Sequence, residues 1–165
     1  MENNSLKKII VYGGGIISNL ASLCLKRNGF DVYQIKSDIK NSKDKTYALS
    51  PSSVDWMKSI GLRDEFFNSL YPIDNIEIIR NDAKASFSAD SVFQPALAYI
   101  VSEKKLMKEI QIKLKSEDFK IFAEPKKIYI ENSLNEVRIK LGDESLQASL
   151  LIACDGANSK IKENL

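Results

Sequence analysis

The sequence predicts an α/β domain, and three consecutive stretches carry that prediction. Residues 7–12 are a short run rich in β-branched side chains that ends in three glycines. Residues 16–28 space their apolar side chains as an amphipathic helix does, Gly29 stands where a glycine commonly ends a helix, and residues 31–35 form a second β-type run. A strand, a tight turn, a helix and a strand in this order form a βαβ unit with parallel strands.

The segments that follow predict two more helices after a loop. Residues 37–45 are polar and typical of a loop. Ser50 and Pro51 have the N-cap and first-turn chemistry of a helix that ends before Gly61, and residues 63–70 predict a second short helix.

The rest of the chain predicts short strands around one further helix. A small antiparallel sheet is expected from residues 75–80 and 85–87, and a strand at residues 99–101 precedes a helix over residues 102–114. Three strands in succession then predict a meander, formed by residues 128–130, 137–141 and 146–152.

Composition limits the partners of this chain. The 165 residues are 44% hydrophobic, enough for one packed domain. The 24 Lys and Arg residues and 22 Asp and Glu residues are scattered along the chain, which does not imply a nucleic acid partner. No apolar run approaches the ~20 residues of a transmembrane helix. Cys24 and Cys154 have no spacing that suggests a disulfide framework or zinc, so a reducing compartment fits best.

The chain contains no histidine. Ser-His-Asp hydrolysis, Cys-His nucleophilic catalysis and His-ligated metal sites are therefore excluded, and no metal site is predicted. Any chemistry here is expected to belong to a bound cofactor.

The glycine run is the first candidate cofactor site. Gly13, Gly15 and Ser18 form a GxGxxS pattern between the first strand and the first helix. In that position glycines let the backbone approach a pyrophosphate, which the N–H groups of the helix then bind. The alternative is a glycine-rich turn without a ligand. Gly13 and Gly15 are expected to require glycine, and Ser18 is small enough for the helix to lie close to the strand.

Lys36 departs from the usual dinucleotide site, which offers Asp or Glu to the ribose hydroxyl groups at the end of the second strand. Two interpretations stay open. Lys36 is a solvated surface residue, or it meets the 2′-phosphate of NADP.

A second signature follows the apolar run 150–153, where the sequence continues as Cys-Asp-Gly-Ala-Asn-Ser-Lys. With Asp155 and Gly156 in this setting, the chain resembles the flavin monooxygenases related to para-hydroxybenzoate hydroxylase, whose Asp-Gly motif serves FAD and the visiting nicotinamide nucleotide. The family usually has Ala and Arg where this chain has Cys154 and Lys160.

A narrower resemblance, to the ubiquinone-biosynthesis hydroxylases, rests on the interior of the chain. Ala-Leu-Ser at residues 48–50, Gly-Leu at residues 61–62 and the run 97–101 are similar to segments of that family. Lys45 occupies the place of a family arginine beside the cofactor phosphates, and it keeps the charge but not the planar guanidinium. Lys104 falls near another basic family position.

The resemblance implies a Rossmann-like βαβ FAD-binding domain with a β-meander and part of a small antiparallel substrate sheet. On this resemblance, residues 1–165 are expected to form a single domain, in which residues 71–100 begin an incomplete substrate-binding region. The resemblance also implies a flavoprotein oxidoreductase, a monooxygenase in which NAD(P)H reduces FAD and an aromatic ring is hydroxylated. No catalytic residue is assigned.

The same resemblance implies a polyprenylated phenol of ubiquinone biosynthesis as the substrate, and other ubiquinone-biosynthesis proteins as partners. It places the hydroxylase in the cytoplasm or peripherally at the inner membrane. Family members are much longer, and their second flavin motif lies beyond the position of Leu165. We therefore expect the chain to be a truncated hydroxylase that is inactive alone and binds FAD weakly.

Two other interpretations stay open. The first is a non-catalytic accessory protein of the same fold, favoured by the departures at Ser18, Lys36, Lys45 and Lys160. The second is an NADP-binding Rossmann protein, which Lys36 suits and Asp155-Gly156 disfavours.

Overall fold

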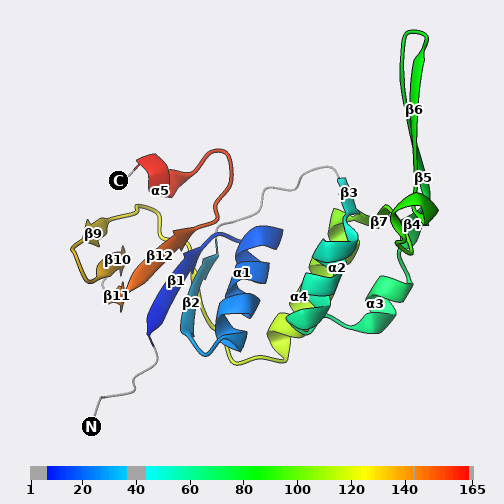
Figure 1. The fold of residues 1–165 in the computed structure, drawn as a ribbon. Helices are drawn as coiled ribbons and strands as arrows, with labels where there is room; N and C mark the ends of the chain where they lie inside the picture. The colour runs from blue at the N-terminus through cyan, green and yellow to red at the C-terminus, as the bar shows by residue number, and fades with distance from the viewer. Residues whose placement is uncertain (1–6, 37–43, 143, 164–165) are drawn as a thin grey trace. The chain divides into compact units, whose positions relative to one another are not determined.

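The computed structural model describes residues 7–36, 44–142 and 144–163, and the chain forms two compact units (Figure 1). The first unit combines residues 1–42 with residues 114–165, and the second consists of residues 43–113. The assignment of the whole chain to a single domain stays a prediction. Most of the loop predicted at residues 37–45 lies outside the described residues.

A four-stranded parallel sheet is the centre of the first unit. Its strand order is β12 (Leu150–Ala153), β1 (Lys8–Tyr12), β2 (Asp31–Lys36) and β8 (Lys120–Ala123). Helix α1 (Ile16–Arg27) connects β1 to β2, which confirms the predicted βαβ unit. The strand β8 was not predicted, because four residues of mixed polarity are too short to show a strand period.

The end of α1 follows the predicted glycine signal. Gly29 has a φ of +80°, and its N–H group donates to the carbonyl of Lys26 at 3.0 Å. The N–H of Phe30 donates to the carbonyl of Leu25 at 3.1 Å. These two hydrogen bonds end the helix, and they form because Gly29 adopts the left-handed conformation.

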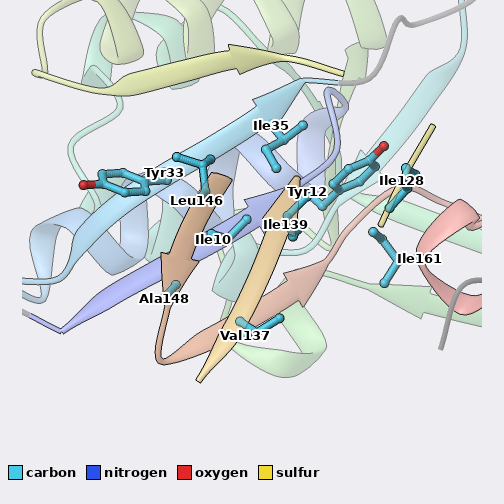
Figure 2. Close-up of a cluster of buried hydrophobic side chains, with 10 residues drawn as sticks. All are labelled: Ile10, Tyr12, Tyr33, Ile35, Ile128, Val137, Ile139, Leu146, Ala148 and Ile161. Carbon is cyan, nitrogen blue, oxygen red and sulfur yellow. The ribbon is translucent and has the colours of Figure 1, made fainter. Parts of the chain in front are cut away.

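A meander covers the face of the parallel sheet that α1 does not cover. Its strands are β9 (Ile130–Asn132), β10 (Val137–Leu141) and β11 (Glu144–Ala148), all antiparallel. Figure 2 shows the cluster of buried side chains between the two layers. They come from both sheets, from Ile128 just before β9 and from α5 (Lys160–Glu163): Ile10, Tyr12, Tyr33, Ile35, Ile128, Val137, Ile139, Leu146, Ala148 and Ile161.

Two strand predictions in this region need correction. The strand predicted at residues 146–152 is two strands, because the chain leaves the meander after Ala148 and enters the parallel sheet at Leu150. Ser149 marks the change, since its N–H group donates to the carbonyl of Lys8 at 3.0 Å. The strand predicted at residues 128–130 begins only at Ile130.

The second unit contains a three-stranded antiparallel sheet and most of α4 (Glu103–Lys115). The strand order is β3 (Thr46–Leu49), β7 (Ala98–Ser102) and β4 (Tyr71–Ile73). Helix α2 (Pro51–Ser59) begins as predicted, with the N–H of Ser53 donating to Ser50 Oγ at 3.2 Å, and α3 (Asp64–Asn68) follows. The short strands β3 and β4 were not predicted.

A separate hairpin extends from this unit, formed by β5 (Asn75–Arg80) and β6 (Ala83–Ser88), and a 3-10 turn η1 (Asp90–Val92) follows it. Cross-strand pairing puts Ile76 opposite Phe87 and Ile78 opposite Ala85, so these four side chains share one face. Ile78 is 56% exposed and Phe87 is 51% exposed. Among the described residues, no helix has the length and apolar character needed to cross a bilayer.

Candidate cofactor-binding site

The turn between β1 and α1 is held by hydrogen bonds from the helix that follows it. Ser18 Oγ donates to the carbonyl of Gly15 at 2.9 Å, and Asn19 Nδ2 donates to the carbonyl of Gly14 at 3.2 Å. Gly15 is the N-cap of α1 and offers no side-chain acceptor to the N–H groups of the first helical turn. Such N–H groups, together with the positive end of the helix dipole, favour an anion such as a pyrophosphate.

Gly13 is required by the neighbouring strand. Its φ is +140°, and a Cβ atom at this position would lie 2.4 Å from the carbonyl oxygen of Cys154. Gly15 differs, since it has a φ of −79° and no heavy atom would lie within 4 Å of its Cβ. The protein itself therefore does not demand glycine at position 15, and the open space there is what the approach of a ligand would need.

Ser18 is buried beneath the turn, and its Cβ would lie 3.1 Å from a Cβ at Gly13. The helix and the glycine turn are thus as close as the sequence analysis expected. A larger side chain at position 18 would push α1 away from β1.

The second predicted turn leaves the strand next to β1. Residues Tyr12 and Ala153 pair at the carboxyl ends of β1 and β12, and the N–H of Cys154 donates to the carbonyl of Tyr12 at 2.7 Å. The glycine turn and the Asp155-Gly156 turn therefore share one edge of the sheet. In open parallel sheets this edge is where ligands bind.

The carboxylate of Asp155 is used within its own turn. It accepts hydrogen bonds from Ser159 Oγ at 2.7 Å, from the N–H of Lys160 at 2.7 Å and from the N–H of Ile161 at 3.3 Å. Gly156 follows with a φ of +87°, a left-handed conformation that favours glycine. Asp155 thus fixes the shape of the turn and leads the chain into α5.

A comparison with known families shows the family of the chain. The profile of the FAD binding domain family matches residues 7–165, which is nearly the whole chain. The chain belongs to this FAD-binding family. Its parallel sheet with a βαβ start, together with small antiparallel sheets, agrees with that assignment.

Relatives of known function are distant and longer. The chain is 26% identical over 167 residues to kynurenine 3-monooxygenase of Dictyostelium discoideum, covering 96% of this chain and 36% of the relative. It is 26% identical over 172 residues to 3-demethoxyubiquinol 3-hydroxylase of Escherichia coli (strain K12), covering 97% of this chain and 44% of the relative. The chain thus spans less than half the length of these relatives.

Solved structures show the same fold. p-Nitrophenol 4-monooxygenase PnpA from Pseudomonas putida DLL-E4 superimposes with a TM-score of 0.75 at 20% identity, covering 96% of this chain and 43% of that structure. The fold is therefore shared over almost all of the present chain.

Lys36 ends β2 at the same sheet edge as the two turns. It pairs with Ala123 of β8, and its carbonyl accepts a hydrogen bond from the N–H of Glu124 at 3.0 Å. None of the ion pairs among the described residues involves Lys36. Lys36 therefore lies at the strand end where a dinucleotide site usually has a ribose-binding carboxylate. The role of Lys36 toward FAD stays a prediction.

Lys45 and Lys104 belong to the second unit and lie near one another there. The carbonyl of Lys45 accepts from the N–H of Glu103 at 2.7 Å, and the N–H of Lys104 donates to Asp44 Oδ1 at 3.1 Å. The other six predicted site residues lie in the first unit: Gly13, Gly15, Ser18, Lys36, Asp155 and Gly156. A contact of Lys45 and Lys104 with the same FAD stays a prediction.

A charged cluster that was not predicted from the sequence lies at the same edge of the first unit. The buried hydroxyl of Tyr12 donates to Glu124 Oε1 at 2.7 Å, and Lys160 Nζ donates to the same oxygen at 2.9 Å. Burial raises the pKa of Tyr12 far above its ordinary value, and the hydrogen bond to the Glu124 carboxylate raises it further. The only signal in the sequence was a tyrosine before the glycines and a glutamate after the missed strand β8.

Proposed function

We propose that this chain is the cofactor-binding part of an FAD-dependent, NAD(P)H-using monooxygenase that hydroxylates an aromatic ring. One observation carries the proposal. The glycine turn and the Asp155-Gly156 turn leave adjacent parallel strands at one sheet edge, so a single dinucleotide can meet both. The names of the two monooxygenase and hydroxylase relatives support the reaction class.

The residues present fit FAD. The first-turn N–H groups of α1 and the open space beside Gly15 would receive the pyrophosphate, while Gly13 lets β12 approach the turn. Lys45 and Lys104 would add positive charge for the phosphates, and Lys36 would lie near the ribose. When bound and reduced by NAD(P)H, FAD supplies the oxygen-activating chemistry.

For the substrate we propose a polyprenylated phenol or quinol precursor of ubiquinone. The support is the similarity of residues 48–50, 61–62 and 97–101 to the ubiquinone-biosynthesis hydroxylases, and the demethoxyubiquinol hydroxylase among the relatives. A lipid-tailed substrate would bring the hydroxylase to the surface of the inner membrane, where other proteins of the pathway are the proposed partners. The equal identity to kynurenine 3-monooxygenase makes kynurenine the substrate to test against it.

The test of cofactor binding is a titration of FAD with the purified chain, followed by quenching of flavin fluorescence and by calorimetry. We expect saturable 1:1 binding of modest affinity, weakened by Gly15→Ala. Arg27→Ala is the matched control, because Arg27 is exposed in the last turn of α1, at the end of the helix opposite the glycine turn. Absence of saturable binding would contradict the proposal.

The test of the substrate uses the full gene product that contains this chain. NADPH-dependent oxygen consumption should respond to a prenylated phenol and not to kynurenine. The opposite preference would overturn the substrate assignment and leave the cofactor assignment intact.

A second candidate is a non-catalytic accessory protein of the same fold. It is favoured by the lysine at the end of β2, where ribose pairing is lost, and by the commitment of the Asp155 carboxylate to its own turn. This candidate predicts no saturable binding of FAD or NADP by the gene product. Saturable FAD binding with turnover would exclude it.

A further inference from the structure

Two buried amide side chains lie beneath the glycine turn. Asn19 on α1 is 2% exposed, and Gln34 on β2 is 0% exposed. Gln34 Nε2 donates to Asn19 Oδ1 at 2.7 Å, and Asn19 Nδ2 donates to the carbonyl of Gly14 at 3.2 Å. Two successive hydrogen bonds therefore connect β2 to the central residue of the three glycines.

Stability alone does not account for this pair. Among the described residues, Gln34 Oε1 is buried and has no hydrogen-bond partner. Burying an amide oxygen without a donor is unfavourable, and replacing a buried polar pair by apolar side chains of similar shape is often neutral or stabilising. Val32 lies two residues earlier on the same face of β2 and packs in an apolar cluster with Ile9 and Val11. An apolar side chain at position 34 would suit this layer better.

The backbone that the pair contacts has unusual freedom. Three consecutive glycines lose more conformational entropy on ordering than any other three residues would. Because the peptide group is planar, a hydrogen bond that fixes the Gly14 carbonyl also fixes the direction of the Gly15 N–H. That N–H lies at the start of α1, beside the open space at Gly15.

We propose that Asn19 and Gln34 are positioning residues that hold the glycine turn in its FAD-binding conformation before the cofactor arrives. Asn19 fixes the Gly14 carbonyl, and Gln34 fixes the Asn19 amide. Because both side chains are buried, they act through the turn and not by contact with FAD. The inference rests on the proposed function, and its physical basis is that donors ordered in advance cost less entropy at binding.

The experiment replaces the pair by apolar side chains of similar size, in the double variant Asn19→Leu with Gln34→Met. Ser22→Ala is the matched control. Ser22 is also buried on α1, but its hydroxyl donates to the carbonyl of Ser18 within the helix, at 2.8 Å, and does not reach the turn. Three quantities are measured for each protein: thermal stability, ¹⁵N relaxation order parameters of residues 13–15 without cofactor, and the Kd for FAD.

We expect the double variant to keep its melting temperature within a few degrees of the wild type. The order parameters of the Gly14 and Gly15 amides should fall from about 0.85, typical of rigid backbone, to below about 0.6. The Kd for FAD should rise about tenfold, which corresponds to about 1.4 kcal/mol. Ser22→Ala should change neither the order parameters nor the Kd for FAD.

Unchanged order parameters in the double variant would overturn the inference, and so would an unchanged Kd in a folded protein. If the double variant does not fold, the single variant Gln34→Met tests the inference. It removes only the bond to Asn19, so the order parameters should fall less and the Kd for FAD should rise less than expected for the double variant. If the wild type shows no saturable FAD binding, the proposed function fails, while the order parameters still decide whether the pair holds the turn.

Discussion

Tyr12 and Glu124 are joined by a 2.7 Å hydrogen bond that ties β1 to β8, the two strands on either side of β2. Lys160 donates to the same carboxylate oxygen at 2.9 Å and so connects α5 to the end of β8. The three residues lie at the sheet edge from which both predicted cofactor turns depart. The cluster therefore holds together the sheet edge at which we propose that FAD binds.

Replacing Tyr12 by Phe should destabilise the first unit. The variant removes a buried hydrogen bond to a carboxylate, which corresponds to a loss of about 1–3 kcal/mol in the free energy of unfolding. Urea denaturation should show a lower midpoint with an unchanged slope. Tyr71→Phe, at an exposed tyrosine, is the control and should leave the midpoint unchanged. Equal midpoints for both variants and the wild type would contradict the prediction.

The same tyrosine predicts a loss of stability in alkali. Burial and the Glu124 hydrogen bond raise the pKa of Tyr12 in the folded state, so the unfolded state ionises first as the pH rises. The contribution of Tyr12 is complete below its unfolded pKa of about 10 and decreases above that pH. Denaturation curves between pH 8 and pH 11 should converge for the wild type and Tyr12→Phe. Parallel curves over that range would show that Tyr12 is not responsible.

Gly13 and Gly15 should respond differently to alanine. Gly13→Ala places a Cβ 2.4 Å from the Cys154 carbonyl at a φ of +140°, and a clash with backbone should cost several kcal/mol or prevent folding. Gly15→Ala meets no atom and has an ordinary φ, so the fold should persist while FAD binding weakens. Thermal melts and FAD titrations measure the two effects. A stable Gly13→Ala protein would show that β12 and the turn are not as close as described.

Lys36→Glu separates two roles of the residue at the end of β2. If Lys36 merely replaces a ribose-binding carboxylate, the variant should bind FAD more tightly, because a carboxylate accepts from both ribose hydroxyl groups. If Lys36 meets the 2′-phosphate of NADP, the variant should lose NADP binding and keep its FAD affinity. Calorimetry with both nucleotides at low and moderate salt distinguishes these results, and we expect the first. A lack of response to either nucleotide in either protein would support the accessory protein.

In the second unit, Arg63 and Glu109 form an ion pair that acid should weaken. Arg63 donates to Glu109 through Nε at 2.9 Å and through Nη2 at 2.6 Å, and these hydrogen bonds lower the pKa of the Glu109 carboxyl. The stabilisation is present above the unfolded pKa of about 4.3 and is lost as the pH falls below it. Glu109→Gln should cost about 1–3 kcal/mol at pH 7 and less at pH 3. Glu77→Gln, in an exposed ion pair with Lys84, is the control and should cost less than about 1 kcal/mol.

The sequence predicted those parts of the fold whose signals are local. The βαβ unit, the start of α2 at Ser50 and the end of α1 at Gly29 each depend on a few neighbouring residues, and the structure confirms them. The strands β3, β4 and β8 were missed because three or four residues form strands there only through pairing with distant partners.

The same distinction holds for the candidate site. The two cofactor turns were visible as motifs at residues 13–18 and 155–156. Two contacts were not predicted because they join different elements of the fold and depend on no local sequence pattern. They are the hydrogen bond from Tyr12 to Glu124 and the bond between the amides of Gln34 and Asn19. The merging of β11 and β12 into one predicted strand has a related cause, since a continuous apolar run does not reveal that its two halves enter different sheets.

The pairing of β1 with β12 also sets an order of events during synthesis. Ile9 cannot find its partner Leu150 until almost the whole described chain has left the ribosome, and residues 43–113 are made in between. Until then β1 has one open, strongly apolar edge, and such edges are prone to pair with the wrong chain. Contacts between residues so distant in sequence also form slowly. The second unit, which is continuous in sequence, is free of this delay, so nascent chains halted near residue 145, before β12 is made, should carry a protease-resistant core from residues 43–113 and an unprotected N-terminal strand.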